Sequence, residues 1–348
     1  MNDFLSKCGR LPQYFLCNLP KAVCFGLSPT KTVQKPAVSL DRFRLLRYDF
    51  PDASIPPEGS CLFRPWLQEG SDTHMESLFT CPVCRSALHR SDTAYRCAQG
   101  HHFDLAAAGY THLLPANKMH SRAPGDDRGM AAARNRFLSG GYYDALAERL
   151  ASLCLAHAPE RPVLVDSGCG EGYYTAKIAA ALRSAGREPR VAGIDISKSC
   201  LRWAAKRDRS IEFAVASAYD LPFATHSADL LLNCFSPLAL SEFRRVLKPG
   251  GVFLYVVPGA RHLWEMKQVL YEKPYLNDEH PSPYEGFSYL DIVPVDGAAA
   301  LPDAQVIHDL FEMTPYFWKT PSAGRERLEA LDRLTVTFSF RIHIFRRD

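Results

Sequence analysis

A short apolar run that leads into three alternating glycines constrains the fold of this chain more than any other feature. The segment 163–172 reads VLVDSGCGEG and places Gly168, Gly170 and Gly172 directly after the apolar run. Glycines at this spacing let the backbone turn sharply after a strand and approach a ligand closely, since they carry no Cβ. The dinucleotide-binding pattern would need its third glycine at position 173, where the chain has Tyr173. The segment therefore predicts a strand, a tight turn and a helix around a ligand other than a dinucleotide.

Apolar runs alternate with helical patterns through the rest of the chain. Strands are expected over residues 162–165, 191–194, 211–214, 229–233 and 251–257, and helices over 131–138, 146–153, 175–182 and 198–206. Alternating apolar residues from Val336 to Ile344 predict a further strand with one more polar face. Strands that alternate with helices are typical of a mostly parallel sheet with helices on both faces. The sequence therefore predicts an α/β fold.

The overall composition sets only broad limits. The 348 residues are 47% hydrophobic and 23% charged, as is usual for a water-soluble globular protein. No apolar stretch approaches the ~18 residues of a membrane span, and the N-terminus lacks the pattern of a secretory signal, so a cytoplasmic location is expected. The net charge of +3 permits a nucleic-acid partner but does not require one.

Three cysteines and a histidine form a pattern typical of a zinc site. Two residues separate Cys81 from Cys84, and three separate Cys97 from His101. Each pair can close a tight turn on a metal, and the four side chains suit a structural, tetrahedral zinc ion with no open position. A segment of ~35 residues buries too little core to fold without such a cross-link. His102 is an alternative fourth ligand, and redox-active or simply buried thiols are the competing interpretation.

Carboxylates and three further segments accompany the glycine turn. Asp166 and Glu171 bring negative charge, which suits the amino group and sulfonium of S-adenosylmethionine, a cofactor without a pyrophosphate. Asp195 ends the second expected strand and can accept hydrogen bonds from ribose hydroxyls. The loop 216–223 follows the third strand, and the segment 245–251 leads into the fifth. In this order the four segments resemble the class I (Rossmann-like) methyltransferase fold, which implies a mostly parallel seven-stranded sheet, here preceded by a small zinc ribbon.

Three longer segments carry a more specific resemblance. CPVC…CAQGHHFDLAAAGYTHLLP, DSGCGEGYYT and PGARHLWEMK stand in the order typical of the 23S ribosomal RNA (guanine-N1)-methyltransferases, and the resemblance covers about residues 75–348. These zinc-ribbon enzymes transfer a methyl group from S-adenosylmethionine to N1 of a guanine in a hairpin of 23S rRNA, and one branch confers resistance to macrolides such as tylosin. The resemblance implies the same substrate, a structural zinc ion and a homodimer for this chain.

The resemblance also assigns residues to the two sites. The zinc ligands fall on Cys81, Cys84, Cys97 and His101. Together with the residues of the glycine turn, the predicted cofactor-binding set is Tyr143, Asp166, Gly168, Gly170, Glu171, Asp195 and His262. Without the resemblance, Tyr143 would more simply be a packing residue and His262 a solvated loop residue.

The substrate side of the site is less defined by the sequence. Residues 233–237 (NCFSP) end the fourth expected strand and depart from the usual family sequence, and no general base is identified. Phe235 is a candidate for stacking on an extruded guanine, with ordinary core packing as the alternative. Candidates for phosphate contacts are Arg85, Arg90, Arg96, Lys118, Arg122, Arg134 and Arg136. The competing functions are a small-molecule methyltransferase and a catalytically inactive zinc-ribbon RNA-binding protein.

Four regions are expected along the chain. Residues 1–74 lack a sustained hydrophobic period, which predicts a poorly ordered N-terminal extension, and Met75 offers an alternative start if the assigned one is wrong. Residues 75–112 form the zinc ribbon, 113–130 a linker and 131–348 the methyltransferase domain.

Overall fold

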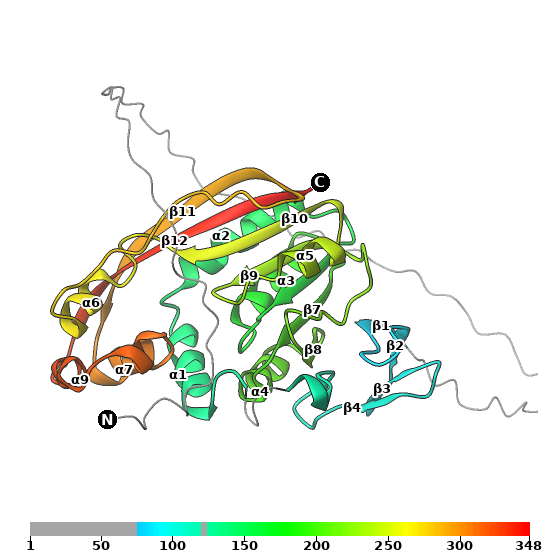
Figure 1. The fold of residues 1–348 in the computed structure, drawn as a ribbon, viewed down its shortest axis with the longest axis horizontal. Coiled ribbons are helices and arrows are strands. Elements are labelled where there is room, and N and C mark those ends of the chain that lie inside the picture. The colour runs from blue at the N-terminus through cyan, green and yellow to red at the C-terminus, as the bar shows by residue number, and fades with distance from the viewer. Residues whose placement is uncertain (1–74, 120–123) are drawn as a thin grey trace, which may run out of the picture. The chain divides into compact units, whose positions relative to one another are not determined.

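An eight-stranded sheet forms the centre of this protein, whose computed structural model describes residues 75–119 and 124–348. The strands lie in the order β11-β12-β10-β9-β6-β7-β8-β5 (Figure 1). Their bounds are β5 Tyr110–His112, β6 Val163–Ser167, β7 Arg190–Asp195, β8 Glu212–Val215, β9 Ala228–Cys234, β10 Leu247–Pro258, β11 Phe287–Leu301 and β12 Leu334–Arg347. Only β12 runs against the others, because it pairs antiparallel with both β10 and β11. The prediction of a mostly parallel sheet is confirmed, whereas the predicted disorder of residues 1–74 lies outside the described residues.

The predicted number of seven strands is too low by one. The additional strand is β5, which follows the ribbon and pairs parallel with β8 at the edge of the sheet. Tyr110 lies opposite Phe213 there, and both Tyr110 and Thr111 are buried. A segment of three residues is too short to show a hydrophobic period, so its pairing with a distant strand decides its structure.

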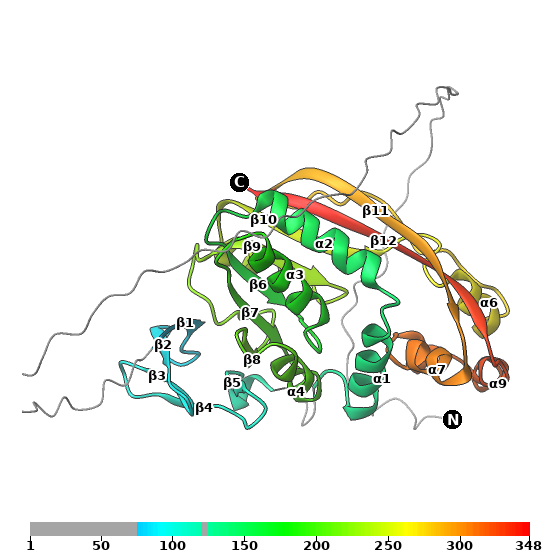
Figure 2. The same cartoon turned by 180° about the vertical axis from the view of Figure 1, so that it is seen from behind.

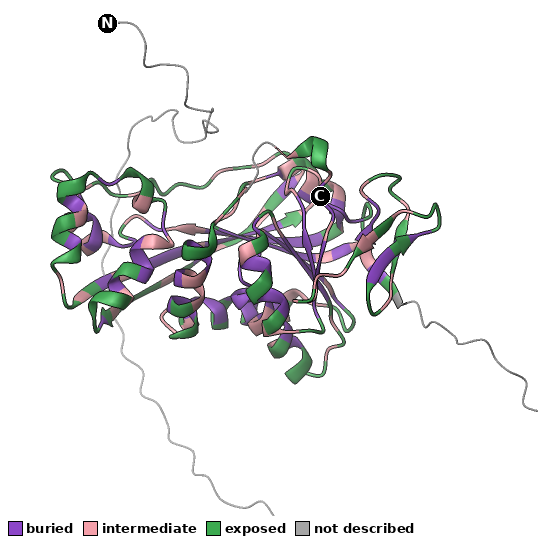
Figure 3. Cartoon of the chain, turned by 90° about the horizontal axis from the view of Figure 1, so that it is seen from below, coloured by how far each residue is buried: buried purple, intermediate pink, exposed green. Residues whose placement is uncertain are grey.

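Side chains alternate between the two faces of the sheet and build two apolar cores. In β9, Leu230 and Leu232 point into the first core and Leu231 into the second. The first core is covered by α1 (Arg128–Ser139), α2 (Asp144–His157), α3 (Tyr173–Ser184) and α4 (Lys198–Arg207), and Figure 2 shows α2 and α3 across this face. Figure 3 shows the strands as a buried layer beside the more exposed helices. Among the described residues, no helix has the length and apolar character that crossing a membrane requires.

The first helix of the domain begins earlier than expected. α1 starts at Arg128, three residues before the predicted start, because the carboxylate of Asp127 accepts the backbone N–H of Met130 at 3.0 Å and caps the helix. Short helices also follow β10 and β11: α6 Trp264–Leu270, α7 Ala304–Glu312, α8 Tyr316–Lys319 and α9 Ser322–Glu329.

The second core is shared between one helix and the zinc ribbon. α5 (Leu240–Val246) contributes Phe243 and Val246. The connection from β8 to β9, residues 216–227, contains no helix, and the ribbon covers the sheet there instead. The ribbon is a four-stranded antiparallel sheet of β1 Met75–Thr80, β2 Ala87–Arg90, β3 Ala94–Cys97 and β4 His102–Asp104. It belongs to the same compact unit as the eight-stranded sheet.

Phe79 of β1 joins the ribbon to the larger sheet. Its side chain is 1% exposed, and its ring centroid lies 5.4 Å from that of Phe223 and 5.9 Å from that of Tyr95. Polar contacts flank this aromatic group: the backbone N–H of Thr80 donates to the carbonyl of Pro222 at 2.8 Å. The ribbon is therefore part of the folded core rather than a module on a tether.

The polar face expected on β12 is covered rather than open to solvent. Thr337 is bound by the carboxylate of Glu265, which accepts both its N–H and its hydroxyl at 2.7 and 2.9 Å. Ser339 is buried, and its hydroxyl donates to Asp296 at 2.6 Å. Polar partners from the segment after β10 and from β11 thus satisfy this face of the strand.

Candidate functional site

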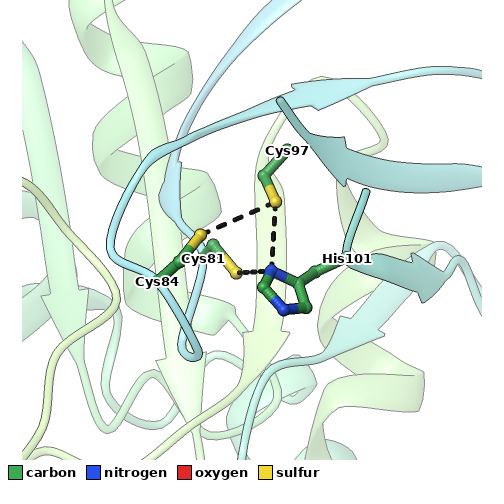
Figure 4. Close-up of side chains that lie close together, drawn as sticks. All are labelled: Cys81, Cys84, Cys97 and His101. Atoms are coloured by element: carbon green, nitrogen blue, oxygen red, sulfur yellow. Dashed lines mark hydrogen bonds between the residues drawn. The ribbon is translucent and has the colours of Figure 1, made fainter. Parts of the chain in front are cut away.

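The four predicted zinc ligands converge in the ribbon (Figure 4). The Sγ atoms of Cys84 and Cys97 lie 3.7 Å apart, and Nδ1 of His101 lies 3.5 Å from Sγ of Cys81 and 3.3 Å from Sγ of Cys97. Zinc bonds of ~2.3 Å to sulfur and ~2.0 Å to nitrogen in a tetrahedron imply separations of roughly 3.8 Å between sulfurs and roughly 3.5 Å between sulfur and nitrogen. The donor set and its dimensions therefore fit structural zinc, with His101 bound through Nδ1. His102 instead pairs with Asp104, its Nε2 lying 2.8 Å from the carboxylate.

Two tight backbone turns present the zinc ligands. The N–H of Arg85 donates to the carbonyl of Cys81 at 2.8 Å, and that of Gly100 to the carbonyl of Cys97 at 3.0 Å. Arg85 and Gly100 have φ of 63° and 82°, the left-handed conformation that lets the chain curl around a metal. The guanidinium of Arg85 forms an ion pair with Asp220 in the loop after β8, so this arginine also holds the ribbon against the sheet.

The glycine turn after β6 adopts the backbone that the sequence predicts. Gly168, Gly170 and Gly172 have φ of 84°, 56° and 77°. A Cβ at Gly168 would lie 1.9 Å from Oγ of Ser236, which shows how closely the loop after β9 approaches the turn. At Gly170 the nearest atom to such a Cβ is Cδ of Arg134, at 4.0 Å. This part of the turn is therefore open to a ligand except where the Arg134 side chain lies.

Two buried carboxylates beside the turn keep acceptor atoms that no described residue satisfies. Oδ2 of Asp166 accepts the hydroxyl of Thr175 at 2.5 Å, whereas Oδ1 of Asp166 and Oε1 of Glu171 have no partner among residues 75–119 and 124–348. Burial raises the pKa of Asp166 to about 7 and raises that of Glu171 above its ordinary value. Buried acceptors of this kind fit a ligand that brings hydrogen-bond donors and positive charge, as the amino group of S-adenosylmethionine does.

Asp195 closes the turn from the end of β7. Its Oδ2 accepts the backbone N–H of Gly170 at 2.9 Å and its Oδ1 that of Ser197 at 2.7 Å. Each carboxylate oxygen keeps a second lone pair for a ribose hydroxyl. Ile196, next to Asp195, and Val215, opposite it in β8, line a cavity of about 230 Å³. The end of β7 thus combines a polar anchor with an apolar recess.

Tyr143 and His262 lie together although they are far apart in the sequence. Both rings pack against Phe340, with centroid distances of 4.9 and 4.6 Å, and their own centroids are 6.3 Å apart. Burial lowers the pKa of His262 to about 3, so the ring is neutral. Its Nδ1 accepts the backbone N–H of Ser339 at 3.3 Å, which leaves the proton on Nε2 and makes that atom a donor. The neutral ring and the aromatic wall suit a ligand contact, which stays a prediction for both residues.

Phe235 occupies an unusual position at the end of β9. It has a φ of 54° and its side chain is 48% exposed. A bulky residue in the left-handed region is an outlier that folded proteins keep mainly at functional sites. The alternative of ordinary core packing does not describe this residue, although its ring touches that of Phe340 at a centroid distance of 5.6 Å.

Several basic residues that were candidates for phosphate contacts form ion pairs with carboxylates of the same chain. Lys118 binds Asp220 at 2.5 Å, and Arg136 binds Asp309 at 2.6 Å. Arg134 forms an ion pair with Asp126 and lies against the glycine turn, with its side chain only 25% exposed. The spacing of residues in the sequence cannot show that Arg134 lies against the glycine turn, because α1 and the turn meet only in the folded chain. Arg122 lies outside the described residues.

Comparison with known proteins agrees with both sites. Residues 79–122 match the family model of the zinc ribbon described as "RlmA, N-terminal", and residues 165–255 match the model described as "Methyltransferase domain". Together with the sheet, the glycine turn and the zinc-ligand cluster, these matches define a zinc-ribbon, S-adenosylmethionine-dependent methyltransferase of class I.

Three relatives specify the family. A Bacillus subtilis protein, YxjB, assigned as a 23S rRNA (guanine-N(1)-)-methyltransferase, is 30% identical over 276 residues, which cover 75% of this chain and 94% of that protein. One from Micromonospora griseorubida with the same assignment is 37% identical over 207 residues, 53% of this chain and 67% of the relative. The 23S rRNA (guanine(748)-N(1))-methyltransferase of Streptomyces fradiae is 37% identical over 193 residues, 55% of this chain and 66% of the relative. The chain therefore belongs to the 23S rRNA (guanine-N1)-methyltransferase family.

Proposed function

We propose that this protein transfers a methyl group from S-adenosylmethionine to N1 of a guanine in a hairpin of 23S rRNA. The observation that carries the proposal is a zinc ribbon packed into the core of a methyltransferase domain. A small acceptor has no use for a metal-held module fixed to the domain, whereas a folded RNA needs a surface that positions its backbone. Family relatives that are named for this reaction support the same substrate.

The target atom determines what the site must do. N1 lies on the Watson–Crick edge of guanine, so the base must be unpaired or extruded from its helix before it can react. The bound cofactor would supply the methyl group: a new N1–C bond forms as the C–S bond breaks, and the N1 proton passes to a base in the site or to water. Most of the acceleration comes from holding N1 about 3–3.5 Å from the methyl carbon. His262 is a poor proton acceptor, because its pKa is about 3 and its Nδ1 is already hydrogen-bonded.

Phe235 is the proposed stacking surface for the extruded guanine. The loop that carries it is braced by Asn233, whose Nδ2 donates to the carbonyls of Ser167 and Pro237 at 3.3 and 3.1 Å. Ser167 directly precedes the glycine turn, so this bracing fixes the exposed ring next to the cofactor site. A rigid aromatic ring contributes roughly 1–3 kcal/mol of stacking energy to a single-stranded base.

Assembly and location complete the proposal. A homodimer would place two ribbons on one RNA hairpin, as the family resemblance implies. Arg90 and Arg96 on β2 and β3 of the ribbon are the proposed phosphate contacts, because no carboxylate within the described part of the chain forms an ion pair with them. We place the protein in the cytoplasm, where bacterial 23S rRNA, its proposed substrate, is modified.

Transfer of labelled methyl to unmodified 23S rRNA tests the reaction. Reverse transcription then locates the product, because a methyl group at N1 blocks base pairing and produces a new stop at the modified guanine. Label that appears only in small metabolites, without a new stop, would favour a small-molecule methyltransferase. Cofactor binding without any transfer would favour an inactive RNA-binding protein.

The Phe235→Ala variant tests the stacking role. We expect a loss of RNA methylation of roughly 10- to 100-fold with cofactor affinity nearly unchanged, and rescue by Phe235→Tyr. Trp318→Ala is a matched control, since Trp318 is 64% exposed on α8 and has no proposed role. Equal losses of methylation and cofactor binding in Phe235→Ala would refute the stacking role.

A further inference from the structure

Arg134 is a largely buried cation that the proposed function does not yet use. It projects from α1 toward the glycine turn, and its Cδ is the nearest atom to the Cβ position of Gly170, at 4.0 Å. Its side chain is 25% exposed, which is low for an arginine, and its guanidinium pairs with Asp126. Nη2 also donates to the carbonyl of Met313 at 3.1 Å. A charge withdrawn from water in this way needs compensating partners, and Asp126 supplies one of them.

The charges around Arg134 are mostly negative. Asp126, Glu171 and Asp195 all lie close enough to influence its guanidinium. The other nearby arginine, Arg207, is engaged elsewhere: its Nε donates to the backbone carbonyl of Glu171 at 3.3 Å and its Nη2 to Asn135 at 2.8 Å. Arg134 is therefore the cation that lies directly over the open part of the turn.

The cofactor brings charges of both signs into this site. Its amino group and sulfonium are positive and suit the buried carboxylates, but its amino acid also carries a carboxylate, which those same side chains repel. A guanidinium has five N–H donors in a planar fork, of which the contacts with Asp126 and Met313 account for two. The remaining donors can form the paired hydrogen bonds that arginine makes with carboxylates.

We infer that Arg134 binds the carboxylate group of S-adenosylmethionine and thereby fixes the amino-acid end of the cofactor over Gly170. The inference rests on the cofactor of the proposed function and adds a binding residue to it. It also explains why the sequence places a basic residue on α1 at the point where this helix meets the glycine turn. Arg134 acts on binding and not on the transferred methyl group.

Two ligands that differ only in the carboxylate test the inference. S-adenosylhomocysteine has this group, and S-adenosyl-3-thiopropylamine is the same molecule without it. Isothermal titration of the full chain with each ligand is compared for the wild type, Arg134→Gln and Arg134→Lys. Arg136→Gln is the matched control, because Arg136 lies on the same helix but pairs with Asp309. The ratio of the two affinities within one variant is insensitive to a general loss of folded protein.

We expect Arg134→Gln to weaken binding of S-adenosylhomocysteine by roughly 10- to 100-fold and to leave the decarboxylated ligand within about 3-fold of wild type. Arg134→Lys should lose less, since it keeps the charge, and Arg136→Gln should resemble wild type. Equal losses for both ligands in Arg134→Gln, or no loss, would overturn the inference alone. A wild type that binds neither ligand would overturn the proposed cofactor together with it.

Discussion

Phe79→Ala should destabilise the methyltransferase domain even though the residue belongs to the ribbon. Phe79 is 1% exposed and packs between Tyr95 of the ribbon and Phe223 of the domain. Removing a fully buried phenylalanine costs about 3–5 kcal/mol of unfolding free energy. For a domain of this size that corresponds to a fall in Tm of roughly 6–20 °C.

The chain allows the two parts to be followed separately. Three of its four tryptophans are in the methyltransferase domain, at Trp203, Trp264 and Trp318, and none is in residues 75–112. In a Trp66→Phe background, tryptophan fluorescence during urea unfolding reports the domain alone, while zinc release to a colorimetric chelator reports the ribbon. If the core is shared, Phe79→Ala lowers the midpoints of both signals together.

The same assay can refute the shared core. Val83→Ala is the control, because Val83 lies in the zinc-binding turn and is 63% exposed, so its truncation should move neither midpoint. If Phe79→Ala releases zinc at a lower urea concentration but leaves the midpoint of the fluorescence signal unchanged, the ribbon is an independent module. The apolar contacts across the second face would then contribute little to stability.

Three further variants test other parts of the structure. Cys84→Ser should abolish stoichiometric zinc, measured by plasma mass spectrometry, because three ligands do not hold the ion as four do; full retention of zinc would refute the ligand set. Gly168→Ala should abolish cofactor binding and lower Tm, because its Cβ would lie 1.9 Å from Oγ of Ser236. Gly186→Ala is the control: Gly186 has a φ of 76° and open space around it, so this substitution should lower the free energy of unfolding by only about 1 kcal/mol. The free energy of unfolding of Asp166→Asn, measured with urea, should exceed that of wild type by an amount that grows to about 4 kcal/mol as the pH rises from about 4 to 7. Above pH 7 this difference should stay constant.

The sign of the last prediction follows from protonation. Burial raises the pKa of Asp166 to about 7 in the folded protein, whereas the unfolded chain ionises near pH 4. Between these values the folded state binds more protons, so wild-type stability falls as pH rises, and asparagine removes the effect. A difference between the two proteins that does not change with pH would mean that Asp166 ionises normally.

The parts that could be predicted from the sequence are those fixed by neighbouring residues. The zinc ligands come in two short pairs and the glycine turn occupies five positions, so local spacing defines both. β11 was not predicted, because residues 287–301 contain Pro294, Gly297 and three consecutive alanines, all poor strand formers. Its pairing with β12 along nearly its whole length, a contact between distant segments, overrides that local preference.

Around the cofactor site, too, positions set by the local sequence could be predicted, whereas positions set by contacts between distant segments could not. Asp195 stands at the end of β7, as its position after an apolar run predicts, and its contact with a ribose stays a prediction. The position of Arg134 against the glycine turn could not be predicted from the sequence, since only the packing of α1 against the turn reveals its neighbours. The exposed, left-handed conformation of Phe235 also depends on the folded loop and leaves no mark in the local sequence pattern.

Phe79 and Phe223 pack the ribbon against the sheet that carries the glycine turn. If Arg90 and Arg96 contact RNA phosphates as proposed, this packing holds them at a fixed distance from the glycine turn. A hairpin whose contacted phosphates lie one helical step too near or too far would dock without presenting its guanine. Selectivity could then arise from the length of an RNA stem as much as from the identity of its bases.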